Sequence, residues 1–502
     1  MVGEVEAGVD PTPAALQLPA GWARTLASCG LILAAALQAA DYAIVTVALP
    51  QLEHDLGTGL NLGAWVIVSY LCATAVTAPL TGWLRRRYGA QRLFIGAVGG
   101  FIAASLLCAF SPSAAAIILF RLLQGAAGGL IHPLAQAMLL DIYPTERHGK
   151  IIGVFSAGLM GGLVLGPPLG GFITDLASWR WVFLINLPLG CVAIACIWRL
   201  RSLTETNRDR TIDPLGILLL ITGIGALQLF LARGIDHSWF QSPEISLEAI
   251  ITFSSFTLLT ARARGRGITV FRPDILKDVN FVVACVYQFM LSALLFATIV
   301  FLPLLAEGPL GLPAMVGGSL ITPRAIVLML VMLFVGRLIG RIDQRVLLVG
   351  GWLLMAGGLF VLAAVPPRHP AGWIIIGSSI QSVGAGILYI PLVTLAYSTL
   401  TADRRTDAAG LYILLRQLGY ASGVALMTSV LRAATAANLS RLVAAGGTKS
   451  PQLANAAASA AYAECFEIMA IASLILVPGA FLFRLRGLGD NTGAPVAPSG
   501  GG

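Results

Sequence analysis

Apolar runs of about 20 residues recur along this chain and constrain its fold more than any other sequence feature. An α-helix of that length spans the hydrocarbon core of a lipid bilayer. A soluble fold is excluded, because 57% of the 502 residues are apolar and only 11% are charged, and a chain of this size cannot bury so many apolar side chains. We therefore predict about fourteen membrane-spanning helices. The runs lie near residues 25–49, 62–84, 92–111, 113–140, 149–173, 181–199, 213–232, 245–261, 280–305, 314–338, 346–365, 371–398, 407–432 and 466–484.

The loops between these runs differ in charge. Arginine and lysine concentrate in the loops after the even-numbered runs, whereas the alternate loops carry few. Because basic loops stay on the cytoplasmic side, both termini are predicted to be cytoplasmic. The net charge of +8 is thus a topology signal, and no nucleic-acid partner is expected.

Glycines recur at a fixed spacing and indicate an internal repeat. In three pairs of glycines the second residue follows the first by 257 positions. The pairs are Gly153 and Gly410, Gly162 and Gly419, and Gly166 and Gly423. Gln124 and Gln381 share this spacing. The repeat predicts two similar helix bundles in parallel orientation, as in transporters whose halves rock about a central site.

The predicted fold is an all-α polytopic membrane protein with two pseudo-symmetric six-helix bundles and two inserted helices. The predicted parts are a disordered cytoplasmic N-terminus, an N-terminal bundle, an inserted two-helix region, a C-terminal bundle and a disordered tail, at residues 1–23, 24–203, 204–278, 279–486 and 487–502. The seven cysteines lie mostly inside apolar runs without C-x-x-C spacing. That placement favours small apolar side chains over metal ligands or disulfides.

Several short sequence motifs lie in the first half of the chain. They are D-Y-A-I-V-T-V-A-L-P at Asp41–Pro50, G-W-L-R-R-R-Y-G at Gly82–Gly89, R-L-L-Q-G at Arg121–Gly125, G-x-x-x-G-P-P-L-G-G at Gly162–Gly171, W-R-W-V-F-L-I-N-L-P-L-G at Trp179–Gly190 and I-D-P-L-G at Ile212–Gly216. With these motifs the chain resembles the major facilitator superfamily, specifically its fourteen-span drug:proton antiporter branch of the EmrB/QacA type. The resemblance implies the major facilitator fold and a multi-pass location in the bacterial cytoplasmic (inner) membrane.

The chain departs from the family pattern at two places. Ala40, Ala43 and Thr46 replace the Leu, Thr and Asn that are usual in the first-span signature. Arg86 stands where the superfamily's loop motif has Asp, a residue that normally helps to hold one conformation closed. We expect that latch to be built differently here.

Asp41 and Arg121 are the candidates for proton coupling and substrate contact. Asp41 lies inside the first apolar run, where an ionised carboxylate must pair or take up a proton. Arg121 is its natural partner, because a guanidinium stays charged at any working pH, and the resemblance to R-x-x-Q-G implies a role in proton transfer. The alternatives are a structural aspartate at a water-filled mouth and an interfacial arginine.

Three further polar residues inside apolar runs are cavity candidates. Arg324 and Arg416 have uncharged counterparts in the other half, so each is expected either to function in a cavity or to form a structural pair. His132 titrates near neutral pH. It precedes Pro133, however, and satisfying a carbonyl that the proline frees is the favoured interpretation.

Two glycine-containing motifs are expected to control conformation. Small residues four positions apart allow close helix contact, and prolines bend a helix; the hinge residues of this antiporter motif are Gly162, Gly166, Pro167, Gly170 and Gly171. The cytoplasmic loop is expected to gate the rocking cycle or merely to anchor topology. Its residues are Gly82, Arg86, Arg87 and Gly89.

The function predicted from the sequence is export of hydrophobic or amphipathic small molecules, such as drugs and toxic compounds, in exchange for protons. A pathway lined with apolar side chains suits such substrates. The alternatives are a dedicated exporter of one siderophore or natural product and a transporter-like membrane sensor. We find no nucleotide-binding loop and no H-E-x-x-H, so no enzyme activity, catalytic residue, metal or cofactor is expected.

The resemblance also bears on protein partners. It implies a periplasmic membrane-fusion adaptor and an outer-membrane channel as candidates. A long extracellular loop over Ala434–Glu464, rich in alanine, is the predicted docking surface for the adaptor.

Overall fold

A computed structural model of the chain describes most of its residues. The described ranges are 21–56, 62–144, 147–198, 213–234, 239–266, 273–312, 320–339, 341–366, 369–445 and 450–483. The predictions of disorder at 1–23 and 487–502 lie outside these ranges, except that the first helix already begins at Trp22.

The chain divides into two compact units. Unit 1 contains Met1–Phe230, Pro243–Phe271 and Ala409–Ile413, and unit 2 contains Leu231–Ser242, Arg272–Ala408 and Leu414–Gly502. The predicted inserted pair of helices, at residues 213–232 and 245–261, falls mostly in unit 1.

The first ten α-helices build unit 1, apart from the last residues of α9. They are α1 (Trp22–Asp55), α2 (Leu62–Thr77), α3 (Thr81–Tyr88), α4 (Ala90–Ala109), α5 (Ala114–Ile142), α6 (His148–Leu176), α7 (Trp179–Leu184), α8 (Asn186–Trp198), α9 (Pro214–Arg233) and α10 (Pro243–Arg266), with the 3₁₀ turn η1 (Ala78–Leu80) between α2 and α3.

The later helices build unit 2, apart from five residues of α16. They are η4 (Pro273–Lys277), α11 (Val279–Glu307), α13 (Ile321–Leu338), α14 (Gln344–Ala363), α15 (Pro370–Ser398), α16 (Ala402–Ala444), α17 (Pro451–Leu476) and η5 (Val477–Leu482), and the short η3 (Trp239–Gln241) precedes α10.

The helices confirm the predicted all-α membrane fold. Within the described residues, 12 helical segments are long and apolar enough to cross a membrane. The two other predicted spans correspond to α13, with 18 residues, and α16, with 43. The least apolar predicted run, at 245–261, is a helix as well, namely α10. Helices satisfy their backbone hydrogen bonds internally, as a lipid environment requires.

Several helices begin at side chains that cap their first turn. Ser113 accepts a hydrogen bond from the Ala116 amide at the start of α5, and Asp278 accepts one from the Phe281 amide at the start of α11. Such residues satisfy amides that have no partner within the helix. The caps place these helix starts at the ends of the apolar runs.

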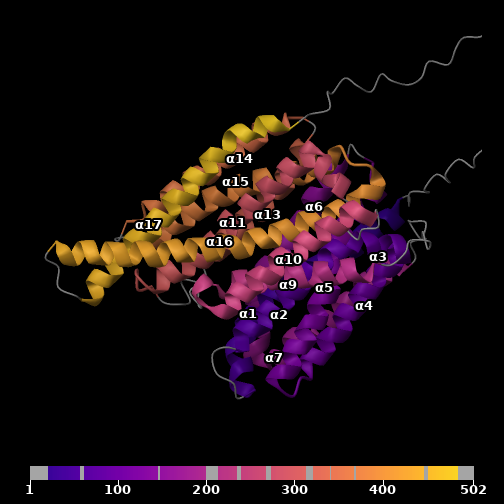
Figure 1. Ribbon diagram of the computed structural model, residues 1–502, viewed down its shortest axis with the longest axis horizontal. Coiled ribbons are helices and arrows are strands. Elements are labelled where there is room, and N and C mark those ends of the chain that lie inside the picture. The colour runs from indigo at the N-terminus through magenta and orange to yellow at the C-terminus, as the bar shows by residue number, and fades with distance from the viewer. Residues whose placement is uncertain are drawn as a thin grey trace, which may run out of the picture. The chain divides into compact units, whose positions relative to one another are not determined.

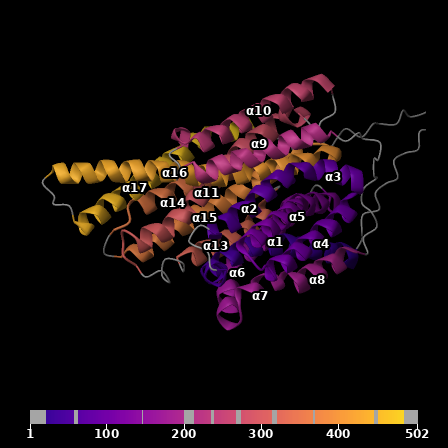
Figure 2. The ribbon, with the colours of Figure 1, turned by 60° about the horizontal axis from the view of Figure 1, so that its bottom comes forward.

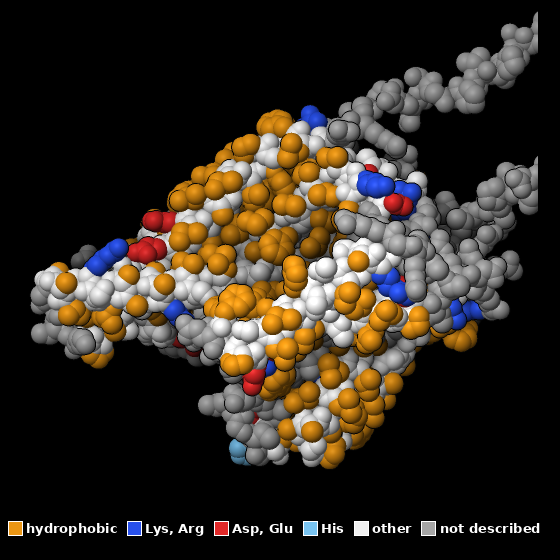
Figure 3. All heavy atoms as spheres, viewed as in Figure 1, with side chains coloured by type: hydrophobic (Ala, Val, Ile, Leu, Met, Phe, Trp, Pro, Cys, Tyr) orange, Lys and Arg blue, Asp and Glu red, His pale blue; other side chains and the backbone are white. Residues whose placement is uncertain are grey.

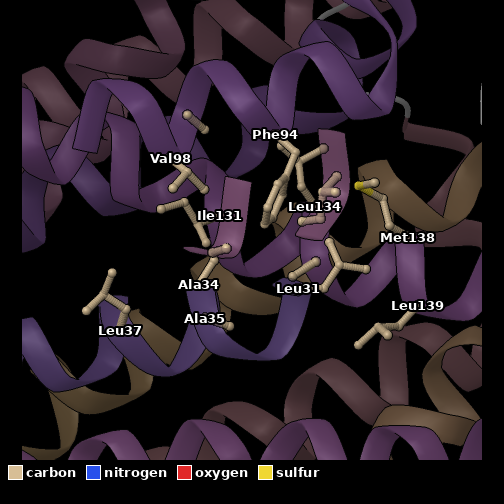
Figure 4. Packing of buried hydrophobic residues seen from close by; sticks show 14 of the residues in the cluster. Leu31, Ala34, Ala35, Leu37, Phe94, Val98, Ile131, Leu134, Met138 and Leu139 are labelled. Atoms are coloured by element: carbon tan, nitrogen blue, oxygen red, sulfur yellow. The ribbon is translucent and has the colours of Figure 1, made fainter. Parts of the chain in front are cut away.

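A core of close-packed apolar side chains joins α1, α4 and α5 in unit 1. Leu31 and Leu37 from α1 meet Phe94 and Val98 from α4 and Leu134 from α5 (Figure 4). Small alanines between the larger side chains let the three helices approach one another. This packing fixes the helices that carry the candidate site.

Glycines of α6 line a close contact with α1. A Cβ atom on Gly162 would lie 2.1 Å from the Ala36 carbonyl oxygen, and one on Gly166 would lie 2.7 Å from the Ala43 Cβ. Real Cβ atoms do not approach so closely, so only glycine fits here. These glycines therefore contact α1 inside the same unit.

Unit 2 repeats this contact between α11 and α16. A Cβ atom on Gly419 would lie 2.4 Å from the Phe289 carbonyl oxygen, and one on Gly423 would lie 2.3 Å from the Ala293 oxygen. The two glycines are the repeat partners of Gly162 and Gly166. The 257-residue spacing therefore reflects a repeated helix contact.

The long extracellular loop predicted over Ala434–Glu464 is wrong. Instead α16 continues to Ala444 and α17 begins at Pro451, and the two helices start from a common end and diverge at an angle in both ribbon views (Figures 1 and 2). The Asn438 amide donates to the Glu464 carboxylate across them over 3.0 Å. Alanine has the highest helix propensity, but hydropathy detects only helices that lipid surrounds.

Apolar side chains cover the outer surface of the helices. On the face shown in Figure 3 they gather over α14 and α17, where Leu353, Phe360 and Ile475 are exposed. Phe253 on α10 is 77% exposed. Exposed apolar surface of this extent matches a lipid environment and not water.

Candidate functional site

Asp41 and Arg121 form a completely buried ion pair in unit 1. Asp41 lies near the middle of α1, Arg121 lies on α5, and the Arg121 Nη1 to Asp41 Oδ2 distance is 2.7 Å. Both side chains have 0% exposure. The interpretation of Arg121 as an interfacial arginine is therefore wrong, because its guanidinium reaches into the bundle and not to the surface.

Two amide side chains complete the shell around the Asp41 carboxylate. Gln124 Nε2 donates to Asp41 Oδ1 over 2.9 Å, and Asn186 Nδ2 donates to the same oxygen over 2.7 Å. The two amides also donate to the Ser105 hydroxyl oxygen, each over 2.7 Å. The carboxylate thus accepts from two helices, α5 twice and α8 once, while α4 supplies the serine.

The Arg121 guanidinium has partners on both of its faces. Nη1 donates to the Gln124 side-chain oxygen over 2.7 Å, and Nε donates to the Val66 carbonyl oxygen over 3.4 Å. The Tyr70 ring of α2 lies 4.1 Å from the guanidinium carbon, and the Phe183 ring of α7 lies 5.9 Å from it. Aromatic faces stabilise a desolvated cation, so Arg121 keeps favourable contacts besides the carboxylate.

Two atoms of this cluster remain open for hydrogen bonding. Arg121 Nη2 and Asn186 Oδ1 are buried and have no partner within the described part of the chain. One is a donor and the other an acceptor. The cluster can therefore bind a water molecule or a polar group of a ligand without first breaking a bond.

Sequence reasoning missed several members of this cluster. Ser105, Asn186 and Tyr70 were not candidates, and Gln124 was noted only as part of the R-L-L-Q-G motif and for the repeat spacing. Asn186 lies within the motif Trp179–Gly190, so a polar residue at that place was a usable signal. Neutral polar residues are common in helices, and their spacing alone does not say which of them meet.

The second half keeps the amide of this cluster and lacks its charges. Gln381 Nε2 donates to the Thr298 hydroxyl over 2.9 Å, and both side chains are buried. Gln381 follows Gln124 by 257 positions, and Thr298 follows Asp41 by the same number. The hydrogen bond is thus common to both units, whereas the ion pair belongs to unit 1.

The other cavity candidates lie apart from the ion pair. His132 is buried on α5, with its ring edge-to-face against Phe155 at 5.2 Å. Arg324 is buried on α13 and Arg416 on α16, both within unit 2. Arg416 Nη1 donates to the Tyr389 hydroxyl over 2.7 Å.

The cytoplasmic loop after α2 is held by an ion pair that the sequence analysis missed. Arg85, at the end of α3, pairs with Asp141, at the end of α5, and both side chains are mostly buried. Arg86 occupies the position of the family's Asp, and the neighbouring Arg85 makes the ion pair instead. The loop is therefore fastened to α5 by a pairing of its own.

The predicted gate residues surround this ion pair. Gly82 is buried within α3, and Gly89 has a φ of +81°, a conformation that favours glycine, between α3 and α4. The Arg87 guanidinium lies 6.0 Å from the Trp83 ring centre. Arg86 is half-buried.

The hinge motif continues along the α1 contact. A Cβ atom on Gly170 would lie 2.9 Å from the Ile44 carbonyl oxygen, while Gly171 is half-buried. The side chain of Pro167 lies outside the described residues, although α6 is helical throughout His148–Leu176. Gly166 and Gly170 contact the turn of α1 that carries Asp41.

Metal chemistry finds no support within the described ranges. They hold no group of three or more His, Cys, Asp or Glu residues that could bind a metal ion. The buried polar groups of the site instead form one ion pair with its hydrogen-bonding shell. Ionisable residues buried inside a membrane protein are rare and are candidates for a functional site.

Comparison with known sequences gives consistent matches. Residues 31–424 match the family described as Major Facilitator Superfamily. Multidrug export protein EmrB of Haemophilus influenzae is 31% identical over 410 residues, which cover 81% of this chain and 80% of that protein. Fatty acid resistance protein FarB of Neisseria gonorrhoeae is 31% identical over 411 residues, with coverage of 82% and 81%.

Solved structures share the fold at low sequence identity. The human organic anion transporter MFSD10 (TETRAN) has a TM-score of 0.62 and 14% identity, covering 92% of this chain and 99% of that one. The proton:xylose symporter XylE has a TM-score of 0.59 and 14% identity, covering 91% and 96%. These likenesses concern the fold alone.

Proposed function

Because this chain belongs to the major facilitator superfamily and is a transporter of its multidrug efflux type, we propose that it exports hydrophobic or amphipathic small molecules in exchange for protons. One observation carries the proton step. Asp41 and Arg121 form an ion pair with no exposed surface, and a buried carboxylate can change its charge only together with its surroundings.

Protonation of Asp41 is the event that drives the change of state. A neutral carboxyl no longer attracts the Arg121 guanidinium, which retains its hydrogen bond to Gln124 and its contact with the Tyr70 ring. The protonated and ionised states thus favour different separations of α1 and α5. An arrangement with two such states responds to a proton by a shift of population.

The glycine contact passes this change to α6. A Cβ atom on Gly166 would lie 2.7 Å from the Ala43 Cβ and 3.2 Å from the Ala40 oxygen, so the glycine packs on α1 on either side of Asp41 in the sequence. A closely packed interface has few alternative arrangements and moves as a unit. In this scheme α6 follows the turn of α1 that carries the carboxylate.

The substrate class follows from composition and from the relatives. The chain offers apolar side chains and few charges, which suits compounds without many polar groups. Among its relatives, EmrB is a multidrug export protein and FarB is a fatty acid resistance protein. Both names point to amphipathic or hydrophobic compounds that enter membranes.

Location and partners belong to the same proposal. The transporter would lie in the bacterial cytoplasmic membrane with both termini in the cytoplasm, as the distribution of arginine indicates. The hairpin of α16 and α17 beyond the apolar part of α16 would then face the periplasm. We assign the adaptor contact to this helical hairpin, in place of the loop expected from the sequence.

Proton coupling is tested with the purified full-length protein in liposomes that contain a pH-sensitive dye. Wild-type protein should release protons into the lumen when a hydrophobic dye is transported, and Asp41→Asn should abolish this coupled movement. Asp55→Asn is the matched control, because Asp55 lies on the same helix, is exposed and keeps an oxygen for the Trp179 indole.

Two results would contradict the proposal. Coupled export by Asp41→Asn at the wild-type rate would remove the carboxylate from the mechanism. Absence of substrate-dependent proton movement with the wild-type protein would instead favour the membrane sensor.

A further inference from the structure

A buried arginine in unit 2 lacks the counter-charge that Arg121 of unit 1 possesses. Arg324 on α13 is 3% exposed, and its Nη1 has no hydrogen-bond partner. No carboxylate forms an ion pair with it in the part of the chain that the structure describes. An uncompensated buried guanidinium is strongly unfavourable, and inside a membrane protein it marks a functional site.

The other buried arginine of unit 2 is held differently. Arg416 donates to the Tyr389 hydroxyl over 2.7 Å, whereas no such bond is formed by Arg324 Nη1. In unit 1, Arg121 is compensated by Asp41 at 2.7 Å. Arg121 Nη2 also lacks an acceptor, but Arg121 has a carboxylate partner, whereas Arg324 has none within the described residues.

The internal repeat shows which part of α15 lies beside Arg324. In unit 1 a Cβ atom on Gly129 would meet the Thr74 carbonyl oxygen at 2.6 Å. In unit 2 a Cβ atom on Gly386 would meet the Leu328 oxygen at 3.4 Å. Leu328 follows Thr74 by 254 positions, and Gly386 follows Gly129 by 257. The α13–α15 contact therefore repeats the α2–α5 contact.

One turn earlier on both helices, the same register brings two buried donors together. In unit 1, Gly125 packs against the Tyr70 backbone, since a Cβ atom on Gly125 would lie 2.3 Å from the Tyr70 carbonyl oxygen. The same spacings of 254 and 257 lead from Tyr70 to Arg324 and from Gly125 to Ser382. Ser382 thus occupies the position on α15 that faces the Arg324 turn of α13.

Ser382 shares the unsatisfied state of Arg324. Its side chain is 0% exposed, and its hydroxyl has no hydrogen-bond partner. A guanidinium N–H and a hydroxyl, both buried and both unbonded, stand at the same level of two packed helices. A carboxylate oxygen accepts from both, and its charge compensates the guanidinium.

We propose that Arg324 and Ser382 form an anion subsite in unit 2, whose ligand is the carboxylate of an amphipathic organic acid. The proposal rests on the proposed export function and narrows its substrate class. The apolar tail of such a compound suits the apolar surroundings, and its head supplies the acceptor that the two donors lack. A neutral amphipath accepts the hydrogen bonds without compensating the guanidinium charge, and a cationic one is repelled by it.

Binding is measured calorimetrically with the purified full-length protein in an uncharged detergent. The probes are decanoate and decanamide, which share the alkyl chain and differ in charge. Wild-type protein should prefer decanoate. Arg324→Gln should weaken decanoate binding at least about tenfold and decanamide binding much less, because only decanoate loses a charge-assisted bond. Ser382→Ala should weaken decanoate binding about fivefold.

Three further variants define the controls. Arg337→Gln removes an exposed arginine from the same helix and should bind both probes as the wild type does. Arg324→Lys keeps the charge and should recover part of the decanoate affinity. Asp41→Asn should still bind decanoate, since no proton gradient enters this measurement, so failure of coupling and failure of the subsite are told apart.

Several outcomes would overturn the subsite. Equal affinities of the wild type for the two probes would do so, as would unchanged decanoate binding in Arg324→Gln. An equal loss of both probes in that variant would assign Arg324 a structural role. Competition of phosphatidylglycerol with decanoate in nanodiscs, present in the wild type and absent in Arg324→Gln, would assign the site to a lipid headgroup.

Discussion

At the scale of single residues, the Asp41 carboxylate is defined by its donors as much as by its charge. Arg121, Gln124 and Asn186 all donate to it at 2.7 to 2.9 Å. A buried carboxylate with several donors has one preferred geometry, and each donor that is lost leaves an acceptor unsatisfied. Asn186 is the most distant of these donors along the chain, and it ties α8 to α1.

Replacing Asn186 tests whether this shell matters for stability. Asn186→Ala should lower the free energy of unfolding by about 1–3 kcal/mol, because the buried carboxylate and the Ser105 hydroxyl each lose a donor. Thermal unfolding of the purified protein in detergent measures the change. Asn455→Ala, at an exposed position of α17, should leave the midpoint within one degree or so of the wild type; an equal loss in both variants would contradict the argument.

At this scale the sequence identified the buried charged residues and did not identify the neutral polar residues that bind to them. Asp41, Arg121, Arg324 and Arg416 stood out because ionisable residues are rare inside apolar runs. Asn186 and Ser105 did not, since neutral polar side chains can hydrogen-bond within their own helix. That Asn186 meets Asp41, 145 positions away, depends on how α8 packs against α1, which no local pattern contains.

At the scale of helices, glycine sets the distance between α1 and α6. The Gly162 position lies so close to the Ala36 carbonyl that a methyl group has no room, at 2.1 Å. Gly99 on α4, by contrast, has open space around its Cβ position. The two glycines therefore differ in packing while both lie in helices.

This difference gives a matched pair of substitutions. Gly162→Ala should lower the free energy of unfolding by about 1–3 kcal/mol through overpacking, and it should slow transport because α6 no longer follows α1. Gly99→Ala should raise stability by about 0.5–1 kcal/mol, since alanine favours the helix. Unfolding midpoints measure the stability of both variants, and dye export measures their transport. Wild-type export by Gly162→Ala would exclude the glycine contact from the mechanism.

The ion pair between α3 and α5 is a second feature at this scale. Arg85 and Asp141 join the two helices at their cytoplasmic ends, where the family's usual Asp is replaced by Arg86. Because most of each side chain is buried, loss of one partner leaves a charge without compensation.

A charge exchange tests this latch. Asp141→Arg should impair transport strongly, whereas the double variant Arg85→Asp with Asp141→Arg should recover a substantial part, because the pair is restored with opposite polarity. Uptake of a hydrophobic dye into everted vesicles measures both. Lys277→Asp, at an exposed pair with Asp274, should have little effect; lack of recovery in the double variant would argue against the pairing.

The glycine motif and the loop illustrate what sequence can predict about elements. The motif spacing identified a close helix contact correctly, because small residues four apart lie on one face. It did not identify the partner, which is α1 of the same unit. The helical hairpin was missed for another reason, since an alanine-rich segment in water is helical without being apolar enough to register as a span.

At the scale of the whole molecule, the arrangement of arginine predicts which side each connection faces. If both termini are cytoplasmic, the ends of α16 and α17 that meet near Ser440 face outward, and the turn η4 before α11 faces inward. In a cysteine-free background, Ser440→Cys should react with a membrane-impermeant maleimide in spheroplasts. Lys277→Cys, on η4, should react only after the membrane is opened; the reverse pattern would invert the topology.

The number of spans and the two-bundle plan were predictable because they depend on length, hydropathy and repetition, which are properties of the linear sequence. The internal repeat also relates individual contacts. Its counterparts Gln124 and Gln381 form the same kind of hydrogen bond, each within its own unit. Repetition could not show that unit 2 would bury Arg324 without a carboxylate. That difference arises from what surrounds the repeated position.

The length of α16 has a mechanical consequence. Its 43 residues correspond to about 64 Å of helix, roughly twice the thickness of the hydrocarbon core. A rod that reaches so far beyond the membrane amplifies any tilt that occurs within it. A fluorophore near Ser440 would therefore move several times farther than the side chains at the centre of the bilayer, and would report each turnover from outside the cell.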